Sequence, residues 1–493
     1  MKKYILIILC CLTSFPLWSY NVNMIVEHYS VDQGLPNNTV NCTLKDRDGF
    51  IWFGTWYGLC CFDGVKFKTF NKQEHDSDVP PRKIQRIVED KNGYIWVKTI
   101  DRKLYVFNKV TECFHAVYDD MKNYSENIQV IKLQNTAEGD VLLLTKDKNL
   151  LLAGVDEKGQ VTIKILFDSR NEINKHDYTL KHHVLCETEE YISWIGTDYK
   201  VAAVHKGSEL ASRPADFITS KINSGDKDSF TSFFEDGRKV WVGDRAGIFY
   251  SIDVRTGLVN RYVLSEIKGA ISNLLVTPAG YVYLSVAGQG TYEYDLAERR
   301  LQKINTEMND AMVTHAFIDQ YDKIWFHENE KALIYYDPLN HTAKRFPFTM
   351  FGKITTLYSE DAGERGLFFL SPAGEAWLFD REHAEMVYIN KLKQLSNDRT
   401  NQQFYHLMLD NDGVLWLSSA DEGVYCMNFP KKQFNLLSLS PQSAGQENYA
   451  TGVRALFQSK SGDIWVGTRW QSVYRMDRNG VTKHVFSTGD EHI

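Results

Sequence analysis

An aromatic frame recurs along most of this chain and limits the folds open to it. Three clear copies lie at 48–55, 92–99 and 461–468, reading Asp-Gly-Phe-Ile-Trp-Phe-Gly-Thr, Asn-Gly-Tyr-Ile-Trp-Val-Lys-Thr and Ser-Gly-Asp-Ile-Trp-Val-Gly-Thr. The position held by Trp in these copies, hereafter the Trp position, recurs at intervals of 42 to 52 residues, at Trp52, Trp96, Leu142, Trp194, Trp241, Tyr283, Trp325, Phe369, Trp416 and Trp465. A period of about 40 to 50 residues is typical of propellers and solenoids, so we expect a series of similar units.

Each unit is expected to fold as four short strands. In the first unit, alternating apolar residues and the hairpin signal Asp63-Gly64 predict strands at 40–44, 51–55, 59–62 and 65–70. Aromatic residues make up 13% of the chain and Gly outnumbers Pro by 32 to 11, which favours strands joined by tight turns. Alternation with period two argues against a helical solenoid, and no Gly-His or Trp-Asp signature recurs as in WD40 repeats. We therefore predict an all-β fold, a β-propeller, whose Trp residues pack between neighbouring sheets.

The first twenty residues have the pattern of a secretory signal peptide. Lys2 and Lys3 precede an apolar run at 4–12, which is too short for a confident membrane-spanning helix. Residues 1–20 are therefore expected to direct export, either with cleavage near Ser19 or as an uncleaved anchor. Beyond this segment we expect no membrane span.

Charge and cysteine content exclude other classes of protein. The formal net charge is −7, so nothing favours nucleic acid as a partner. Six cysteines follow the signal segment without a CxxC pair, which is too few in a chain of 493 residues for a disulfide scaffold.

The opening of the repeat region resembles a known family. Residues 46–64 read Asp-Arg-Asp-Gly-Phe-Ile-Trp-Phe-Gly-Thr-Trp-Tyr-Gly-Leu-Cys-Cys-Phe-Asp-Gly, which resembles the two-component regulator propeller repeat. Residues 29–38 read Tyr-Ser-Val-Asp-Gln-Gly-Leu-Pro-Asn-Asn, which resembles the leader of the sensor domains of hybrid two-component systems in Bacteroides-like bacteria. The resemblance implies a periplasmic sensor that binds oligosaccharides and controls genes for polysaccharide use. It also implies a homodimer anchored in the inner membrane, with a histidine kinase and a DNA-binding module after the sensor.

In that family the sensor has two seven-bladed propellers. The resemblance therefore implies a seven-bladed first propeller at 21–345 and an incomplete second propeller of about three blades at 346–493. On this view the chain is a sensor region truncated before its membrane helix and kinase, as a fragment, a frameshifted product or one part of a split gene, and it is not itself an enzyme. The strand expected near 26–31 is left open: it either closes the first ring or pairs elsewhere.

Candidate ligand-binding residues follow from the up-and-down topology. With strands A to D counted from the centre, the B–C loops and the D–A connections share one edge of the ring, which we call the B–C edge. The A–B and C–D turns share the other, the A–B edge. Aromatic faces and Arg or Lys suit sugars, including uronic or sulfated ones. The B–C loops offer such side chains as candidates at Trp56, Tyr57, Arg102, Tyr199, Lys200, Arg245, Arg469 and Trp470.

The sequence offers no catalytic, metal-binding or cofactor-binding motif. The pair His182-His183 has no matching ligands nearby, and no nucleophile elbow, P-loop or dinucleotide fingerprint occurs. Neither a catalytic residue, a metal nor a cofactor is therefore expected. Two alternatives to a carbohydrate sensor stay open: a secreted propeller lyase or hydrolase acting on polysaccharide, and a propeller that serves as a protein-interaction scaffold.

Overall fold

The computed structural model describes residues 25–70, 81–122, 124, 129–169, 180–188, 190–196, 201–207, 230–304, 313–328, 331–351, 358–361, 366–371, 375–389, 404–428, 452–469, 472–477 and 482–487. The chain divides into two compact units, Met1–Phe429 and Pro430–Ile493. In the described part, regular structure is strand apart from α2 (Tyr118–Met121) and the 3-10 helices η1 (Val31–Gln33) and η2 (Phe348–Phe351). No helix of the described part is long and apolar enough to cross a membrane. The segment at 1–20, expected to be a signal peptide, lies outside the described residues.

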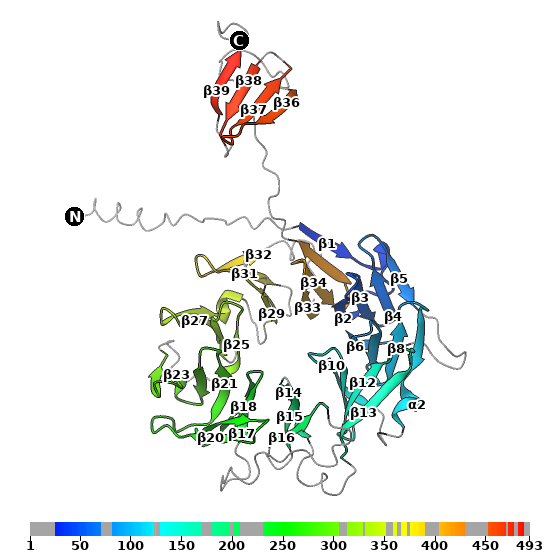
Figure 1. Ribbon diagram of the computed structural model, residues 1–493, viewed down its shortest axis with the longest axis vertical. Coiled ribbons are helices and arrows are strands. Elements are labelled where there is room, and N and C mark those ends of the chain that lie inside the picture. The colour runs from blue at the N-terminus through cyan, green and yellow to red at the C-terminus, as the bar shows by residue number, and fades with distance from the viewer. Residues whose placement is uncertain are drawn as a thin grey trace, which may run out of the picture. The chain divides into compact units, whose positions relative to one another are not determined.

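The first half of the ring contains four antiparallel sheets, each following the chain from its inner to its outer strand (Figure 1). Their strands are β2 (Val40–Lys45), β3 (Ile51–Thr55), β4 (Gly58–Phe62) and β5 (Phe67–Phe70); β6 (Ile84–Glu89), β7 (Ile95–Thr99), β8 (Leu104–Asn108) and β9 (Cys113–Ala116); β10 (Val130–Asn135), β11 (Val141–Thr145), β12 (Leu150–Val155) and β13 (Val161–Phe167); and β14 (Leu180–Glu187), β15 (Tyr191–Gly196) and β16 (Val201–His205). The first three have the four strands that the repeat predicts, and the fourth has three in its described part.

The second half of the ring has the same plan. Its strands are β17 (Phe230–Glu235), β18 (Lys239–Asp244), β19 (Phe249–Asp253) and β20 (Val259–Tyr262); β21 (Ile271–Val276), β22 (Tyr281–Val286), β23 (Gly290–Asp295) and β24 (Arg300–Lys303); β25 (Val313–Ile318), β26 (Ile324–Glu328), β27 (Ala332–Asp337) and β28 (Thr342–Pro347); β29 (Tyr358–Asp361), β30 (Leu367–Leu370), β31 (Ala376–Asp380) and β32 (Glu385–Ile389); and β33 (Phe404–Leu409), β34 (Leu415–Ser419) and β35 (Val424–Asn428) with β1 (Ile25–Tyr29). The all-β propeller architecture predicted from the repeat is confirmed.

The N-terminal strand closes the ring. Strand β1 pairs antiparallel with β35, with Ile25 opposite Asn428 and Tyr29 opposite Val424, and so supplies the outer strand of the last sheet. Apolar side chains of that sheet and of the sheet β2–β5 then share one cluster. In the described part, a hydrophobic cluster fills each of the nine junctions between consecutive sheets of this unit.

The division of the chain differs from the one expected from the family. We expected a ring of seven sheets that ends near residue 345, followed by three sheets of a second ring. In the structure the first compact unit continues to Phe429 and includes nine sheets in its described part. The physical reason is the pairing of β1 with β35, because the ring closes on the sheet that receives the N-terminal strand.

The second compact unit holds one sheet in its described part. Its strands are β36 (Val453–Gln458), β37 (Ile464–Thr468), β38 (Ser472–Met476) and β39 (Thr482–Ser487). Val466, Tyr474 and Met476 form its small core, whereas Leu456 and Phe457 of β36 are exposed.

Residues at the Trp position form the core between sheets of the first compact unit, as predicted, whereas Trp465 of the second unit is half-buried. Trp96, Trp194 and Trp325 are fully buried, and the carboxylate of a turn Asp fixes several of these indoles. Asp90 accepts hydrogen bonds from the backbone N–H groups of Asn92 (2.9 Å) and Tyr94 (3.0 Å), and from Nε1–H of Trp96 (2.9 Å). The same turn-to-indole bond joins Asp46 to Trp52, Asp236 to Trp241, Asp319 to Trp325 and Asp410 to Trp416. One carboxylate therefore shapes the A–B turn and satisfies a buried indole N–H.

A β-bulge occupies the same place in the inner strands. The register shifts between the first and third residues of β2, β6, β10, β17, β21, β25, β33 and β36. The third residue of the inner strand then lies opposite the second residue after the Trp position. In the first sheet, Cys42 lies opposite Gly54 in this way. A Cβ on Gly54 would come within 2.4 Å of Sγ of Cys42, which explains the glycine of the frame.

Candidate functional site

Backbone hydrogen bonds fasten the B–C edge from one sheet to the next. Lys83 precedes β6, and its N–H donates to the carbonyl of Trp56 in the B–C loop of the preceding sheet (3.0 Å). Its carbonyl in turn accepts from Ile100, which follows β7 (2.9 Å). The N–H of Val130 donates to the carbonyl of Arg102 (2.9 Å), which links the next sheet in the same way. The loops of three consecutive sheets, β2–β5, β6–β9 and β10–β13, are therefore held as one surface.

Trp56 and Tyr57 form an aromatic surface on this edge. Trp56 is 43% exposed and Tyr57 is 63% exposed. Nζ of Lys83 lies 5.2 Å from the centroid of the Trp56 ring, in a cation–π contact. Exposed aromatic faces beside a cation are suited to stack on a sugar ring and to bond its hydroxyl or acidic groups.

Arg102 lies in the tight B–C turn of the next sheet, with a left-handed backbone. Its N–H closes the turn on the carbonyl of Thr99 (2.9 Å), and its φ is 67°. Lys148 has the same place in the turn of the sheet β10–β13, with φ of 70°. In the sheet β17–β20 this place belongs to Gly247, with φ of 82°, which is the residue type that adopts such a conformation without steric cost.

Two further cations lie opposite each other on the inner strands, just below this edge. Arg86, the third residue of β6, pairs across the strands with Lys98 of β7. Arg86 is exposed, whereas Lys98 is 7% exposed and donates to Oε1 of Gln85 (2.7 Å) and to the carbonyl of Ile131 (2.8 Å). Burial lowers the pKa of Lys98, and the charges of Arg102 and Arg86 lower it further. Like charges directly opposite each other destabilise a sheet, so this pair is not explained by the fold.

His406 of β33 borders the same region. Burial lowers the pKa of His406 to about 4, and the charge of Arg86 contributes to the shift. Its Nδ1 is buried and has no hydrogen-bond partner in the described part of the chain. At neutral pH this imidazole is therefore uncharged.

The structure brings together only part of the predicted site. Trp56, Tyr57 and Arg102 lie on neighbouring sheets joined through Lys83. Arg245 is exposed on a B–C loop, but two sheets separate its own sheet from that of Arg102. Arg469 is exposed in the other compact unit, and Tyr199, Lys200 and Trp470 lie outside the described residues.

Reasoning from the loops missed Lys83, Arg86, Lys98 and Lys148. A signal for Lys98 was present, because it replaces the glycine of the frame: residues 95–99 read Ile-Trp-Val-Lys-Thr where residues 51–55 read Ile-Trp-Phe-Gly-Thr. Arg86 could be found only with the register, since the bulge of β6 places it opposite Lys98.

Several cations of the A–B edge are held in ion pairs. Nζ of Lys109 lies between the carboxylates of Asp46 (3.1 Å), Asp48 (2.6 Å) and Glu89 (2.8 Å). These are the one group of three acids in the described part close enough to share a metal ion, and the ammonium of Lys109 fills it. Burial would lower the pKa of Lys109, but the hydrogen bonds to the three carboxylates raise it overall.

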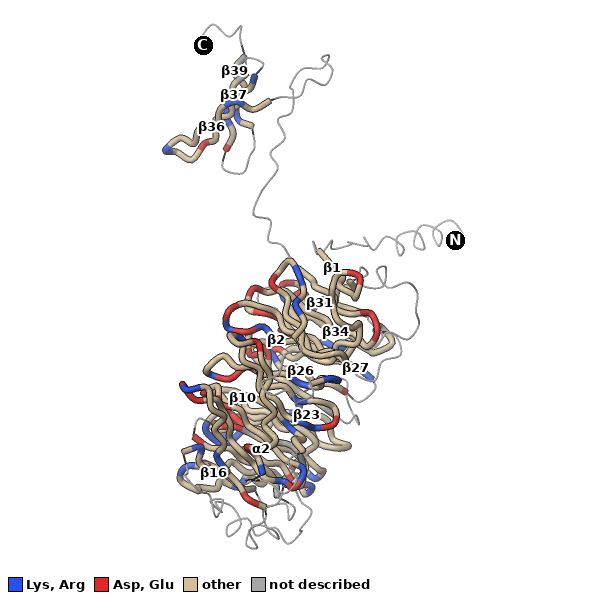
Figure 2. Tube along the Cα trace, turned by 90° about the vertical axis from the view of Figure 1, so that its right-hand side faces the viewer, with Lys and Arg blue, Asp and Glu red and all other residues tan. Residues whose placement is uncertain are grey.

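Other cations of the A–B edge are paired in the same way. Nη1 of Arg381 lies 2.6 Å from Asp319, and Nη2 lies 2.7 Å from Asp361. Lys45 reaches Asp410 (3.5 Å) and Asp412. Charged residues gather at strand ends and turns rather than along the strands (Figure 2). The ring therefore has an edge of compensated charge opposite the B–C edge.

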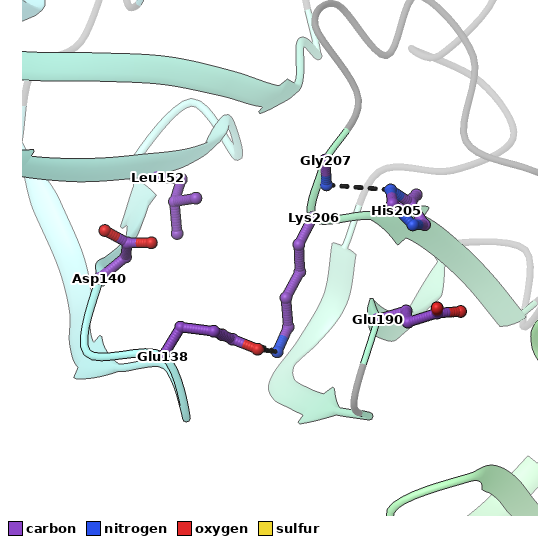
Figure 3. Close-up of a pocket in the computed structure, with 7 residues that line it drawn as sticks. All are labelled: Glu138, Asp140, Leu152, Glu190, His205, Lys206 and Gly207. Atoms are coloured by element: carbon purple, nitrogen blue, oxygen red, sulfur yellow. Dashed lines mark hydrogen bonds and ion pairs between the residues drawn. The ribbon is translucent and has the colours of Figure 1, made fainter.

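A hollow of about 370 Å³ lies on the A–B edge between the sheets β10–β13 and β14–β16. Lys206 crosses it, with Nζ 2.8 Å from Oε1 of Glu138, and the N–H of Gly207 donates to Nδ1 of His205 (Figure 3). The same Nζ lies 2.5 Å from Oε1 of Glu187. The lining of the hollow is paired charge and the imidazole of His205, without an exposed Trp, Tyr or Phe ring, so it suits a sugar less well than the B–C edge does.

A second hollow, of about 410 Å³, contains Cys113, His115 and Asp120. Nε2 of His115 lies 2.7 Å from Oδ2 of Asp120. Sγ of Cys113 donates to the carbonyl of Thr111 (3.4 Å) rather than to the imidazole. The thiol is therefore not activated by the histidine, as a nucleophile in an enzyme would be.

Comparison with known proteins agrees with the sequence at the opening of the repeat region. The family model described as "Two component regulator propeller" matches residues 34–57, which confirms the resemblance there. No curated protein matched the chain.

Solved structures with similar folds include two extracellular domains from B. thetaiotaomicron. The domain of the putative hybrid two component system BT3049 is 15% identical, with 94% of this chain and 67% of that chain covered and a TM-score of 0.33. The domain of the putative hybrid two component system BT4673 is 17% identical, with 93% and 61% covered and a TM-score of 0.29. The Dos1 propeller is 12% identical, with 82% and 94% covered and a TM-score of 0.44. The chain thus spans about 61% of the BT4673 domain.

Proposed function

We propose that this chain is the exported ligand-sensing part of a two-component regulatory system, and that its ligand is an oligosaccharide. The binding site lies on the B–C edge, where the sheets β2–β5 and β6–β9 meet. In the complete system, binding changes a periplasmic homodimer and so controls genes for use of the parent polysaccharide. This chain acts as a binding module and not as an enzyme.

The observation that carries the proposal is the exposed aromatic pair Trp56 and Tyr57 beside Lys83 and Arg102. Two exposed aromatic rings and two cations on loops fastened by backbone hydrogen bonds form a surface that changes little on binding. Such a preorganised surface loses less conformational freedom when it binds a ligand. The match of the family model to residues 34–57, which include both aromatic residues, supports the assignment to a sensor.

Thermal-shift screening of the purified chain against a panel of oligosaccharides tests the proposal. A ligand that binds the native state raises the melting temperature. We expect one class of oligosaccharide to produce such a rise, and Trp56→Ala to abolish it, because the ring that stacks on the sugar is removed.

Tyr388→Ala is the matched control, since Tyr388 of the outer strand β32 is 44% exposed, close to the exposure of Trp56. This variant should keep the full shift. Absence of a shift with every oligosaccharide, in a chain that melts cooperatively, would refute the carbohydrate ligand. Release of shortened or unsaturated products would instead identify a hydrolase or lyase.

A further inference from the structure

Four cations near the B–C edge lack, among the described residues, the carboxylate partners that Lys109 and Arg381 have on the A–B edge. Another cation of the B–C edge, Lys103, does pair with Asp101 (3.4 Å). Arg86, Lys98, Arg102 and Lys148 form no ion pair with any residue in the described part of the chain. On the A–B edge, Lys109 and Arg381 each contact two or more carboxylates. The chain as a whole is acidic, with a net charge of −7, so a lack of available carboxylates does not explain the difference.

Two of these cations, Arg102 and Lys148, have an unfavourable backbone conformation. Arg102 and Lys148 adopt the left-handed backbone that Gly247 provides in the corresponding turn of the sheet β17–β20. An L-residue with a Cβ is disfavoured in this conformation, so glycine would form these turns with less strain. Left-handed residues other than glycine also occur on the A–B edge, for example Glu112 and Asp322, so the strain supports a site only together with the unpaired charges.

Lys98 is likewise out of place for purely structural reasons. No Lys or Arg occupies the corresponding position of the other described sheets, which is opposite the bulge residue of the inner strand and holds Gly54, Leu144, Gly243, Ser285, His327, Ser418 and Gly467. Only in the sheet β6–β9, among the described sheets, is this cross-strand pair composed of two cations. Two of the three N–H donors of the Lys98 ammonium are used, by Gln85 and by the carbonyl of Ile131.

We propose that Arg86, Lys98 and Arg102 bind the carboxylate or sulfate group of an acidic oligosaccharide. The inference rests on the proposed function and specifies the substrate class of that site. The sugar ring stacks on Trp56 or Tyr57, and its acidic group neutralises the like-charged pair on the inner strands. Arg102, on the B–C turn of the same sheet, contacts the ligand from the rim. Bonds between Arg or Lys and an oxyanion are charge-assisted and hence strong.

Isothermal titration calorimetry of the full chain with matched probes tests this inference. Trigalacturonate carries carboxylates, and its methyl ester has the same sugar backbone without charge. A chondroitin sulfate disaccharide carries both a sulfate and a carboxylate, and inorganic sulfate is the anion alone. We expect an acidic sugar to bind at least about tenfold more tightly than the uncharged ester, and the difference to shrink with added salt.

Two variants install residues that other sheets carry at the same positions. Arg102→Gly and Lys98→Ser should each weaken binding of the acidic sugar by about tenfold or more, because each removes a charge-assisted bond. Arg102→Gly should not lower the melting temperature, because it relieves a strained backbone. Lys98→Ser should change it little, because removal of a buried ammonium offsets the loss of its bonds to Gln85 and to the carbonyl of Ile131. Lys91→Gln is the charge-matched control, since Lys91 lies on the A–B edge, where it pairs with Asp140 (2.8 Å).

Each outcome decides the question. Equal binding of trigalacturonate and its ester, or tight binding of neutral oligosaccharides alone, would overturn the acidic ligand and leave the proposed sensor intact. Binding of inorganic sulfate as tightly as either acidic sugar would indicate an adventitious ion only. Unchanged binding in Arg102→Gly and Lys98→Ser would place the acidic group elsewhere. Absence of binding by every sugar would overturn the proposed carbohydrate ligand as well.

Discussion

Replacing Asp90 tests how the turn carboxylate joins the repeat to the core. Asp90 is 1% exposed and accepts three hydrogen bonds, two from backbone N–H groups of its own turn and one from the indole of Trp96. The variant Asp90→Ala removes all three acceptor contacts at once. The N–H of Asn92 is on an exposed residue and regains a bond from water, whereas the indole of the fully buried Trp96 does not.

The expected cost follows from these contacts. A buried donor left without a partner costs about 1–3 kcal/mol, and a hydrogen bond to a charged group contributes about 1.5–3 kcal/mol. With partial recovery at the surface, we expect Asp90→Ala to destabilise the ring by about 3–5 kcal/mol. At about 2.1 cal/mol/K per residue, a ring of roughly 400 residues has an unfolding entropy near 0.8 kcal/mol/K, so the melting temperature should fall by about 4–6 °C.

Differential scanning calorimetry of a double-mutant cycle with Trp96→Phe measures the indole contribution. Since Phe has no N–H, Asp90→Ala should cost about 1–3 kcal/mol less in that background. The control is Thr136→Ala: Thr136 accepts a single turn bond from Asp140 (3.1 Å), and the Trp position of its sheet holds Leu142, so its cost should be about 1 kcal/mol. A coupling energy near zero, or equal costs for the two turns, would refute the reasoning.

Two further perturbations test buried charge. Because burial lowers the pKa of His406 to about 4, the unfolded chain binds a proton that the folded chain does not between pH 6.5 and 4; acidification over this range should cost up to about 3 kcal/mol, and His406→Gln should remove that part of the slope, measured as melting temperature against pH. Burial also raises the pKa of Glu360, to about 7, so its contribution runs the other way, and only the difference between wild type and His406→Gln isolates the histidine. Lys109→Met removes the ammonium shared by Asp46, Asp48 and Glu89, although Glu89 keeps its ion pair with Arg47 (3.2 Å), and should cost about 3 kcal/mol. The exposed pair of Lys68 with Glu112 provides the control, with a cost in Lys68→Met below about 1 kcal/mol by the same calorimetry.

The repeat predicted the sheets well because its signals are local. The Trp position, the turn Asp and the alternating apolar residues lie within about ten residues of one another in each unit, so the sequence itself displays them. Ring closure is different, because β1 and β35 lie about 400 residues apart and no local signal selects that partner. The sequence of β1 suits the outer strand of several sheets along the repeat equally well. The sheet that β1 completes therefore cannot be chosen from the sequence, and the expected ring of seven sheets differs from the observed ring.

The candidate site was predictable only where it lies on loops. Trp56, Tyr57 and Arg102 follow directly from the position of the B–C loop after the frame. Lys98 and Arg86 lie within strands, where alternation assigns each side chain to a face but gives no register between strands. The bulge in β6 shifts that register by one residue, and this shift alone makes the two cations opposite neighbours.

The A–B edge of the ring contributes to the stability of the fold, whereas we expect the B–C edge to bind the ligand. On the A–B edge, a buried carboxylate such as Asp46 completes the turn, the indole bond of Trp52 and the ion pair of Lys109 together, so a change there affects folding first. On the B–C edge, Arg102 adopts a left-handed backbone that is unfavourable for a residue with a Cβ, and its guanidinium forms no ion pair with a described carboxylate. Variants of the A–B edge should therefore lower the melting temperature and leave the affinity of the folded fraction unchanged. Variants of the B–C edge should lower the affinity for the ligand and leave the melting temperature of the free protein unchanged. A ligand that binds there should raise the melting temperature most in the wild-type chain, which keeps Arg102.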